Sequence, residues 1–178
     1  DQARLEWLPL EAIAYNDCQG TNRAIFNLAP GAELITWDVT ALGLPTSDQA
    51  FKQGHFQQHL EIPGVWLERG NIQGTDARWL NSPLGLAGQK CLANLVFACG
   101  SPIAAERAER ALEAARLVIE GHPLKLQAGI TCAHPQVIVL RVMSPLVEPT
   151  MDLLKQVWAT WRHTLWSLPS VLPRIWSV

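Results

Sequence analysis

The chain has 178 residues, of which 48% are hydrophobic and 17% charged, and its formal net charge at pH 7 is −2. A chain of this length and hydrophobicity can bury a sizeable core, which excludes a disordered protein. Its lysine and arginine residues are scattered and are outnumbered by acidic residues, so the charge pattern excludes a nucleic-acid-binding surface.

The first residues carry no recognisable targeting signal. Asp1 stands where an initiator methionine is expected and an apolar pattern begins at Leu5, so we interpret the start as a cut end. The opening is polar and lacks the basic and apolar regions of a secretory signal. The longest apolar stretches, such as 91–99, are far shorter than the about 20 residues of a membrane-spanning helix. We therefore expect a cytoplasmic protein with no membrane partner.

Short runs with partial alternation of apolar and polar residues fill the first half of the chain. Each run is followed by a turn signal such as Pro-Gly or Asn-Asp. The runs lie at 13–15, 23–28, 33–39, 56–62 and 65–72. Evenly spaced short strands of this kind predict stacked antiparallel sheets.

The second half of the chain carries two helix patterns and two further strands. Ser101 as N-cap, Pro102 at the first helical position and Gly121 beyond the end predict a helix at about 101–120. Residues 124–126 and 137–143 are expected to be strands, and the second of these is apolar enough to be buried on both faces. A second helix is expected at about 149–168.

The second helix contains Trp158, Trp161 and Trp166 within nine residues. These tryptophans either pack against the sheets or form a surface for a partner protein, because they carry more aromatic area than one helix face easily hides. The sequence thus predicts a mainly β fold, in which two stacked layers of sheet are flanked by helices at about 101–120 and 149–168. We treat residues 1–178 as a single domain.

The cysteines and most histidines give little sign of a metal site. Cys18, Cys91, Cys99 and Cys132 show no CxxC pair and no short spacing to a histidine, so we expect free thiols. His55 and His59 are four residues apart and share one face in either a strand or a helix. A β-rich metal-dependent hydrolase that uses His55, His59, Glu61 and Glu68 is therefore one hypothesis, whereas the alternation around them favours a strand whose polar face contacts water.

Asp38 and Glu68 are the acidic residues with the most apolar neighbours. Asp38 lies within the apolar run 34–39, and Glu68 follows Val65-Trp66-Leu67. A carboxylate inside a β core is costly unless it is paired, hydrogen-bonded, hydrated or bound to a cation. For Glu68, an ion pair with Arg69 or outward exposure is an alternative explanation.

Several segments resemble the UreD (UreH) family of urease accessory proteins. Residues 5–13 resemble its LEWLPQExI segment, and Leu67-Glu68-Arg69 resembles its L-x-E-R strand. Its W-[DE]…LGRP…F…G stretch is similar to Trp37-Asp38, Leu42-Gly43-Leu44-Pro45, Phe51 and Gly54. Its ending PRIWxT is similar to residues 172–177. Order and spacing agree along the whole chain, which would be the C-terminal part of a family member whose N-terminal part is absent.

The resemblance implies a non-enzymatic protein with two helically wound layers of sheet. Members of the family bind apo-urease and UreF, through which the GTPase UreG is recruited, and nickel is thought to pass through an internal, water-filled tunnel. By this resemblance Asp38 and Glu68 match acidic tunnel positions and would guide a transient Ni²⁺ ion, with no permanently bound cofactor. A protein-interaction module without any metal role is the remaining alternative.

Overall fold

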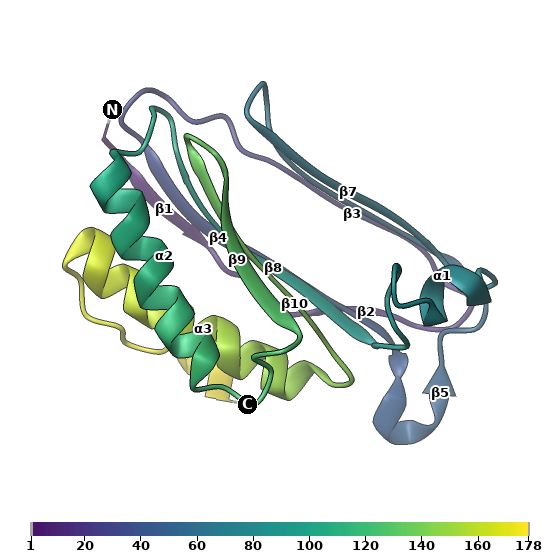
Figure 1. The fold of residues 1–178 in the computed structure, drawn as a ribbon. Helices are drawn as coiled ribbons and strands as arrows, with labels where there is room; N and C mark the ends of the chain where they lie inside the picture. The colour runs from purple at the N-terminus through teal and green to yellow at the C-terminus, as the bar shows by residue number, and fades with distance from the viewer. Residues whose placement is uncertain (1, 178) are drawn as a thin grey trace.

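Two β-sheets stacked face to face form the body of the protein, and two long helices cover the outer face of the larger sheet (Figure 1). A computed structural model describes residues 2–177. The order of the layers is therefore helices, larger sheet, smaller sheet. This arrangement confirms the predicted mainly β fold with two stacked sheets and two long flanking helices.

The larger sheet has the strand order β1-β4-β8-β10-β9, and β2 and β5 also pair with β4. The smaller sheet has the order β3-β6-β7. In the larger sheet the bounds are Arg4–Trp7 for β1, Ala12–Ala14 for β2, Glu33–Leu44 for β4, Gln49–Ala50 for β5, Cys91–Cys99 for β8, Ala128–His134 for β9 and Val137–Ser144 for β10. In the smaller sheet they are Gln19–Ile25 for β3, His55–Ile62 for β6 and Trp66–Gln73 for β7.

The helices are α1 (Ala77–Asn81), α2 (Ala105–Glu120) and α3 (Val147–Trp166), and 3-10 turns span Pro45–Ser47 and Arg174–Ser177. Among residues 2–177, no helix combines the length and the hydropathy that a membrane crossing requires. Cys18, Cys91, Cys99 and Cys132 are free thiols, as predicted.

Three local predictions were wrong. The sheets are mixed, because β1 and β2 pair parallel with β4 and β3 pairs parallel with β6. Residues 124–126 form a turn, and the strand of that region begins at Ala128. Ala104, not Ser101, is the N-cap of α2, because the Ser101 hydroxyl instead accepts a hydrogen bond from the Gly31 amide at 3.3 Å. The helix predicted at about 149–168 is confirmed as α3, whose bounds lie within two residues of the prediction at each end.

The three tryptophans of α3 are buried in the core between the helices and the larger sheet. Each indole N–H has a partner. Trp158 donates to Glu6 Oε1 at 2.8 Å, Trp161 to the Ala111 carbonyl at 3.0 Å and Trp166 to Glu33 Oε2 at 2.5 Å. The structure therefore favours core packing, and the interpretation of these tryptophans as a partner surface is wrong.

Two motifs quoted above have evident structural reasons. Gly43 has φ +74° in the hairpin of β4 and β5, and a Cβ there would lie 2.7 Å from the Phe51 amide nitrogen, which no other L-residue tolerates without strain. Near the C-terminus, the Trp176 ring packs against Trp37 at 4.7 Å and Trp158 at 5.1 Å between centroids. The PRIW segment thus fastens the end of the chain to the sheet.

Glu33 joins the larger sheet to both long helices. Its carboxylate accepts hydrogen bonds from Arg107 of α2 at 2.5 and 3.0 Å and from Trp166 of α3 at 2.5 Å. Burial raises the pKa of Glu33, but these hydrogen bonds and the charges of Arg107 and Arg4 outweigh it, so the pKa is lowered from its ordinary 4.5. A carboxylate with a lowered pKa stabilises the fold above its unfolded-state pKa.

Glu33→Gln is expected to lower the free energy of unfolding by about 2 kcal/mol at pH 7, because charged hydrogen bonds become neutral ones. The difference from the wild type should shrink as the pH falls through the folded-state pKa, which lies below 4.5. Urea unfolding at pH 3 to 7 measures this difference. A difference that stays constant over this range would contradict the assigned role of the Glu33 charge.

Candidate functional site

A row of polar side chains crosses the middle of the larger sheet on the face that meets the smaller sheet. Asp38 of β4 is in register with Asn94 of β8, and Asn94 is in register with Arg141 of β10. Neighbouring strands are about 4.8 Å apart, so Asp38 and Arg141 are separated by about 10 Å between Cα atoms. All three share one face because residues directly opposite in a sheet point the same way.

Apolar clusters flank this polar row at both ends of the space between the sheets. One end holds Leu34, Val96 and Val139 against Ile62 of the smaller sheet. The other end holds Leu42, Phe56 and Ile72, together with Leu80 and Leu86 from the segment around α1. The polar side chains are thus confined to the centre of the layer.

The smaller sheet contributes Gln58 of β6 and Glu68 of β7 from its inner face. Glu68 is in register with the buried Leu60, and Gln58 is only 7% exposed. We call Asp38, Asn94, Arg141, Gln58 and Glu68 the polar belt. Both predicted site residues, Asp38 and Glu68, belong to it.

Asp38 lies at the buried end of the polar belt. It is 6% exposed, and Asn94 Nδ2 donates to its carboxylate oxygens at 3.2 and 3.4 Å. Burial raises the pKa of Asp38 to about 7, the Asn94 hydrogen bond opposes this rise, the charge of Glu68 adds to it and that of Arg141 reduces it. The three charged groups therefore lie within electrostatic reach of one another.

Glu68 and Arg141 form the outer end of the polar belt. Arg141 Nη2 donates to Glu68 Oε2, and the Arg141 and Glu68 side chains are 51% and 25% exposed respectively. The alternative partner Arg69 is in register with His59 and so lies on the opposite face of the smaller sheet. The alternative of an ion pair between Glu68 and Arg69 is therefore wrong, and the ion pair that Glu68 forms joins the two sheets.

Two unpartnered buried oxygens lie on the facing surfaces of the two sheets, and a third lies in the loop before β8. Within residues 2–177, Thr40 Oγ1, Gln58 Oε1 and Gln89 Oε1 are buried side-chain atoms without a hydrogen-bond partner. Thr40 lies on the same face of β4 as Asp38. Buried polar atoms of native proteins nearly always have partners, so such atoms are characteristic of places that hold water or a ligand.

His55, His59 and Glu61 lie on the outer face of the smaller sheet, away from Glu68. Four residues along a strand span about 13 Å, which is too far for two histidines to share one metal ion. His55 instead contacts Asn71, and His59 Nε2 lies 2.8 Å from Glu61 Oε2. Within residues 2–177, no three His, Cys, Asp or Glu side chains are grouped to hold a metal. The residues of the hydrolase hypothesis therefore do not converge.

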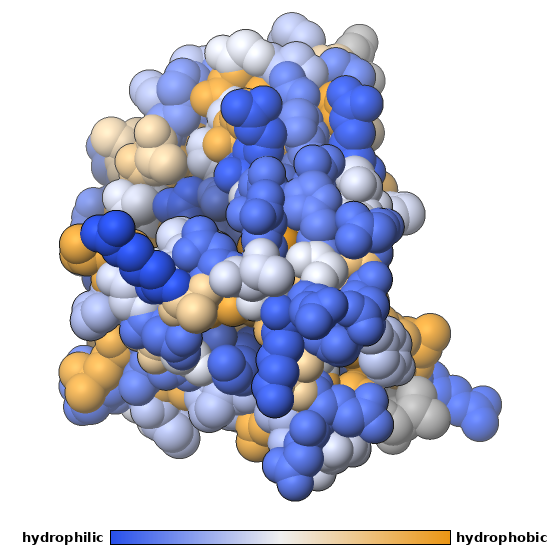
Figure 2. Space-filling view, turned by 90° about the vertical axis from the view of Figure 1, so that its right-hand side faces the viewer, coloured by the Kyte–Doolittle hydropathy of each residue, from blue (hydrophilic) through white to orange (hydrophobic). Residues whose placement is uncertain are grey.

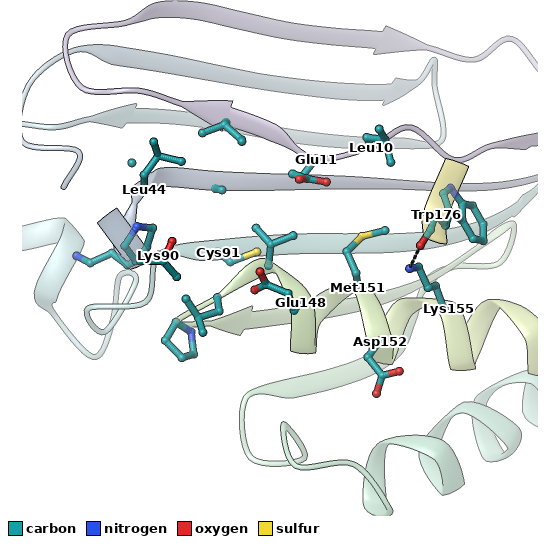
Figure 3. Close-up of a pocket in the computed structure, with 18 of the residues that line it drawn as sticks. Leu10, Glu11, Leu44, Lys90, Cys91, Glu148, Met151, Asp152, Lys155 and Trp176 are labelled. Carbon is teal, nitrogen blue, oxygen red and sulfur yellow. Dashed lines mark hydrogen bonds between the residues drawn. The ribbon is translucent and has the colours of Figure 1, made fainter. Parts of the chain in front are cut away.

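A separate pocket of about 440 Å³ lies on the helix side of the larger sheet, between the segment around β2, β4 and the start of α3 (Figure 3). Glu11 and Glu148 point into it, and Lys155 Nζ donates to the Trp176 carbonyl at 3.1 Å. Neither Asp38 nor Glu68 lines this pocket. The pocket shares no lining residue with the polar belt and is therefore a separate feature.

The end of the molecule that carries α1 and β5 is mainly hydrophilic (Figure 2). On this face apolar side chains lie in small separate groups among polar ones. The segment around α1 supplies Leu80 and Leu86 to the cluster beneath. This end therefore covers the apolar cluster next to the polar belt.

The sequence profile of the UreD urease accessory protein family matches residues 1–177. The chain belongs to the UreD family. The resemblance carried by the LEWLP and PRIW segments is thereby confirmed.

Individual UreD proteins are similar to this chain over nearly all of it. The urease accessory protein UreD of Albidiferax ferrireducens is 57% identical over 176 residues, and that of Paracidovorax citrulli is 54% identical over 176 residues. The UreD of Methylibium petroleiphilum is 40% identical over 189 residues. Each match covers 99% of this chain and 64% of the relative. The chain thus spans 64% of the length of these UreD relatives.

Three members of the polar belt were missed by sequence reasoning. Arg141 interrupts the apolar run 137–143, which is the same signal that singled out Asp38. Asn94 likewise interrupts the apolar strand 91–99. Gln58 gave no signal, because it stands among polar residues of an alternating strand and only the pairing of β6 places it on the inner face.

Proposed function

We propose that the protein acts in urease maturation as a non-catalytic scaffold through which Ni²⁺ passes along the polar belt. The observation that carries this proposal is the buried carboxylate of Asp38, which lies between two sheets in a chain of the UreD family. A buried carboxylate that destabilises the fold calls for a functional reason.

The chemistry of the polar belt suits a transient path for nickel. Its donors are carboxylate and amide oxygens, supplied by Asp38, Glu68, Asn94 and Gln58. Such oxygens bind Ni²⁺ less tightly than thiolates or several imidazoles would, so the ion can leave again. In this function Asp38 and Glu68 guide the hydrated ion, and no covalent bond is made or broken.

We further propose that apo-urease and UreF are direct partners and that UreG is recruited through UreF. These partners are the ones that membership of the family implies. The cytoplasm, where we expect the protein, is the compartment of this assembly. The partner-binding surfaces are then separate from the polar belt, which lies inside the fold.

Urease activation in a host that carries the complete urease gene set tests the proposal. Asp38→Asn and Glu68→Gln in the full-length protein are each expected to lower urease activity at least tenfold, because both remove a charge that attracts Ni²⁺ while keeping the side-chain shape. Glu61→Gln is the matched control, since Glu61 is a carboxylate on the outer face of the smaller sheet.

Co-purification of each variant with UreF separates conduction from assembly. Lost activity with an intact complex supports the nickel path. Full activity of both Asp38→Asn and Glu68→Gln would instead leave a protein-interaction module and contradict the role of the polar belt in conduction.

A further inference from the structure

Arg141 places a permanent positive charge at the outer end of the polar belt. A guanidinium group stays protonated at every physiological pH, so this charge cannot be removed by deprotonation. Its Nη2 donates to Glu68 Oε2, and the row Arg141–Asn94–Asp38 continues from it into the layer between the sheets. The guanidinium group of Arg141 is therefore paired with the Glu68 carboxylate, which a metal cation would need as a ligand.

The oxygens deeper in the layer lack such a partner. Gln58 Oε1 is buried and unpartnered on the inner face of β6, and Thr40 Oγ1 is buried and unpartnered on β4. Asp38 has its Asn94 hydrogen bonds but no cationic partner among its hydrogen bonds and ion pairs in the described part of the chain. The positive charge of the polar belt thus lies at its outer, partly exposed end, which we call its entrance. The oxygens of Gln58 and Thr40, deeper between the sheets, have no hydrogen-bond donor.

We propose that Arg141 is a displaceable counter-ion of the polar belt: it holds Glu68 while no metal is bound, and an entering divalent cation takes its place. This inference rests on the proposed function, and it adds the residue that controls access to the path. Arg141 is a positioning residue for Glu68 in the resting state and leaves when the ion arrives.

The exposure of the two partners makes this exchange physically reasonable. The Arg141 side chain is 51% exposed, so its guanidinium can move into water without burying its charge elsewhere. Glu68 is only 25% exposed and remains at the entrance. An ion pair at such a partly exposed place is weak enough to be broken by a competing charge.

The exchange also explains a preference for divalent ions. A monovalent cation carries the same charge as the guanidinium group and gains little by replacing it. A divalent cation interacts twice as strongly with Glu68 at the same distance. Arg141 therefore selects against the monovalent cations that are abundant in a cell.

The test is calorimetric titration of the full-length protein with NiCl₂. Arg141→Gln is expected to raise the Ni²⁺ affinity at least fivefold, because Glu68 loses its competing partner. Arg141→Lys should give a smaller rise, since it keeps the charge but loses the planar contact. The matched control is Arg69→Gln, which removes the same charge from the outer face of β7 and should leave the affinity unchanged.

Two combinations of results overturn the inference. An unchanged or lower affinity in Arg141→Gln, with reduced affinity in Glu68→Gln and Asp38→Asn, would contradict the displacement while leaving the proposed function intact. Unchanged Ni²⁺ binding in all three variants would overturn the inference and the proposed function together. The double variant Glu68→Gln/Arg141→Gln should lose the gain of Arg141→Gln, because the gain depends on the freed carboxylate.

Discussion

Trp161→Ala is expected to lower the free energy of unfolding by about 4 kcal/mol, which is the range for large-to-small replacements of buried aromatic residues. The Trp161 side chain is fully buried between α3, α2 and the larger sheet. Its ring packs on Phe97 of β8 at 6.3 Å between centroids, and its N–H donates to the Ala111 carbonyl of α2. One side chain thus connects three elements, and its removal leaves a cavity that backbone atoms cannot fill.

Urea unfolding of the variant beside two controls measures this loss. Trp161→Phe keeps most of the ring volume but loses the donor, so we expect it to cost about 1 to 2 kcal/mol. Leu117→Ala lies on the solvent side of α2, where Leu117 is 77% exposed, and should change stability by less than about 0.5 kcal/mol. A loss below about 1 kcal/mol in Trp161→Ala would show that α3 does not depend on this core.

Local patterns sufficed to predict much of the fold. The two long helices and the strand at Val137–Ser144 follow from periodicity and from β-branched residues, and their placement needed no knowledge of distant contacts. The parallel pairing of β3 with β6 could not be predicted, because the register joins residues about 36 positions apart. Strand β8 at Cys91–Cys99 lies at the centre of the sheet, and its nearly continuous burial removes the alternation that marks a strand.

The candidate site was predictable only where a charge interrupts an apolar run. Asp38 and Glu68 met that condition, and the structure places both between the sheets. The pairing of Glu68 with Arg141 depends on the stacking of two sheets, 73 residues apart in sequence. His55 and His59 were considered as a metal pair because they share one face in either a strand or a helix, but along the strand that they form they lie too far apart to share one ion.

Asp38→Asn is expected to stabilise the fold at pH 8 and to leave its stability nearly unchanged at pH 4. The pKa of Asp38 is about 7 in the folded protein and 3.8 in an unfolded chain, because burial disfavours the charged form. Between these values the folded state holds a proton that the unfolded state lacks, so stability falls as the pH rises from about 4 to about 7. Above that range the carboxylate is ionised in both states and the loss stays constant.

The difference between 3.8 and about 7 corresponds to a loss of at most about 4 kcal/mol. The amide introduced by Asp38→Asn carries no charge at any pH and can still accept the hydrogen bond from Asn94, so the variant should escape this loss. Urea unfolding of wild type and variant at pH 4 to 8 measures it, and Asp48→Asn, at an exposed aspartate in a turn, controls for the removal of a carboxylate. A stability gain of Asp38→Asn that is the same at every pH would contradict the raised pKa of Asp38 in the folded protein.

This dependence is opposite in sign to that of Glu33, whose charge stabilises the fold and is lost in acid. Glu33 is ionised because hydrogen bonds from Arg107 and Trp166 compensate its burial, whereas the Asn94 hydrogen bond and the more distant charge of Arg141 do not compensate the burial of Asp38. Of the two carboxylates of strand β4, Glu33 thus stabilises the fold in its charged form, whereas Asp38 destabilises it. If Asp38→Asn is more stable than the wild type and yet fails to support urease activation, the destabilising charge of Asp38 is retained because function requires it.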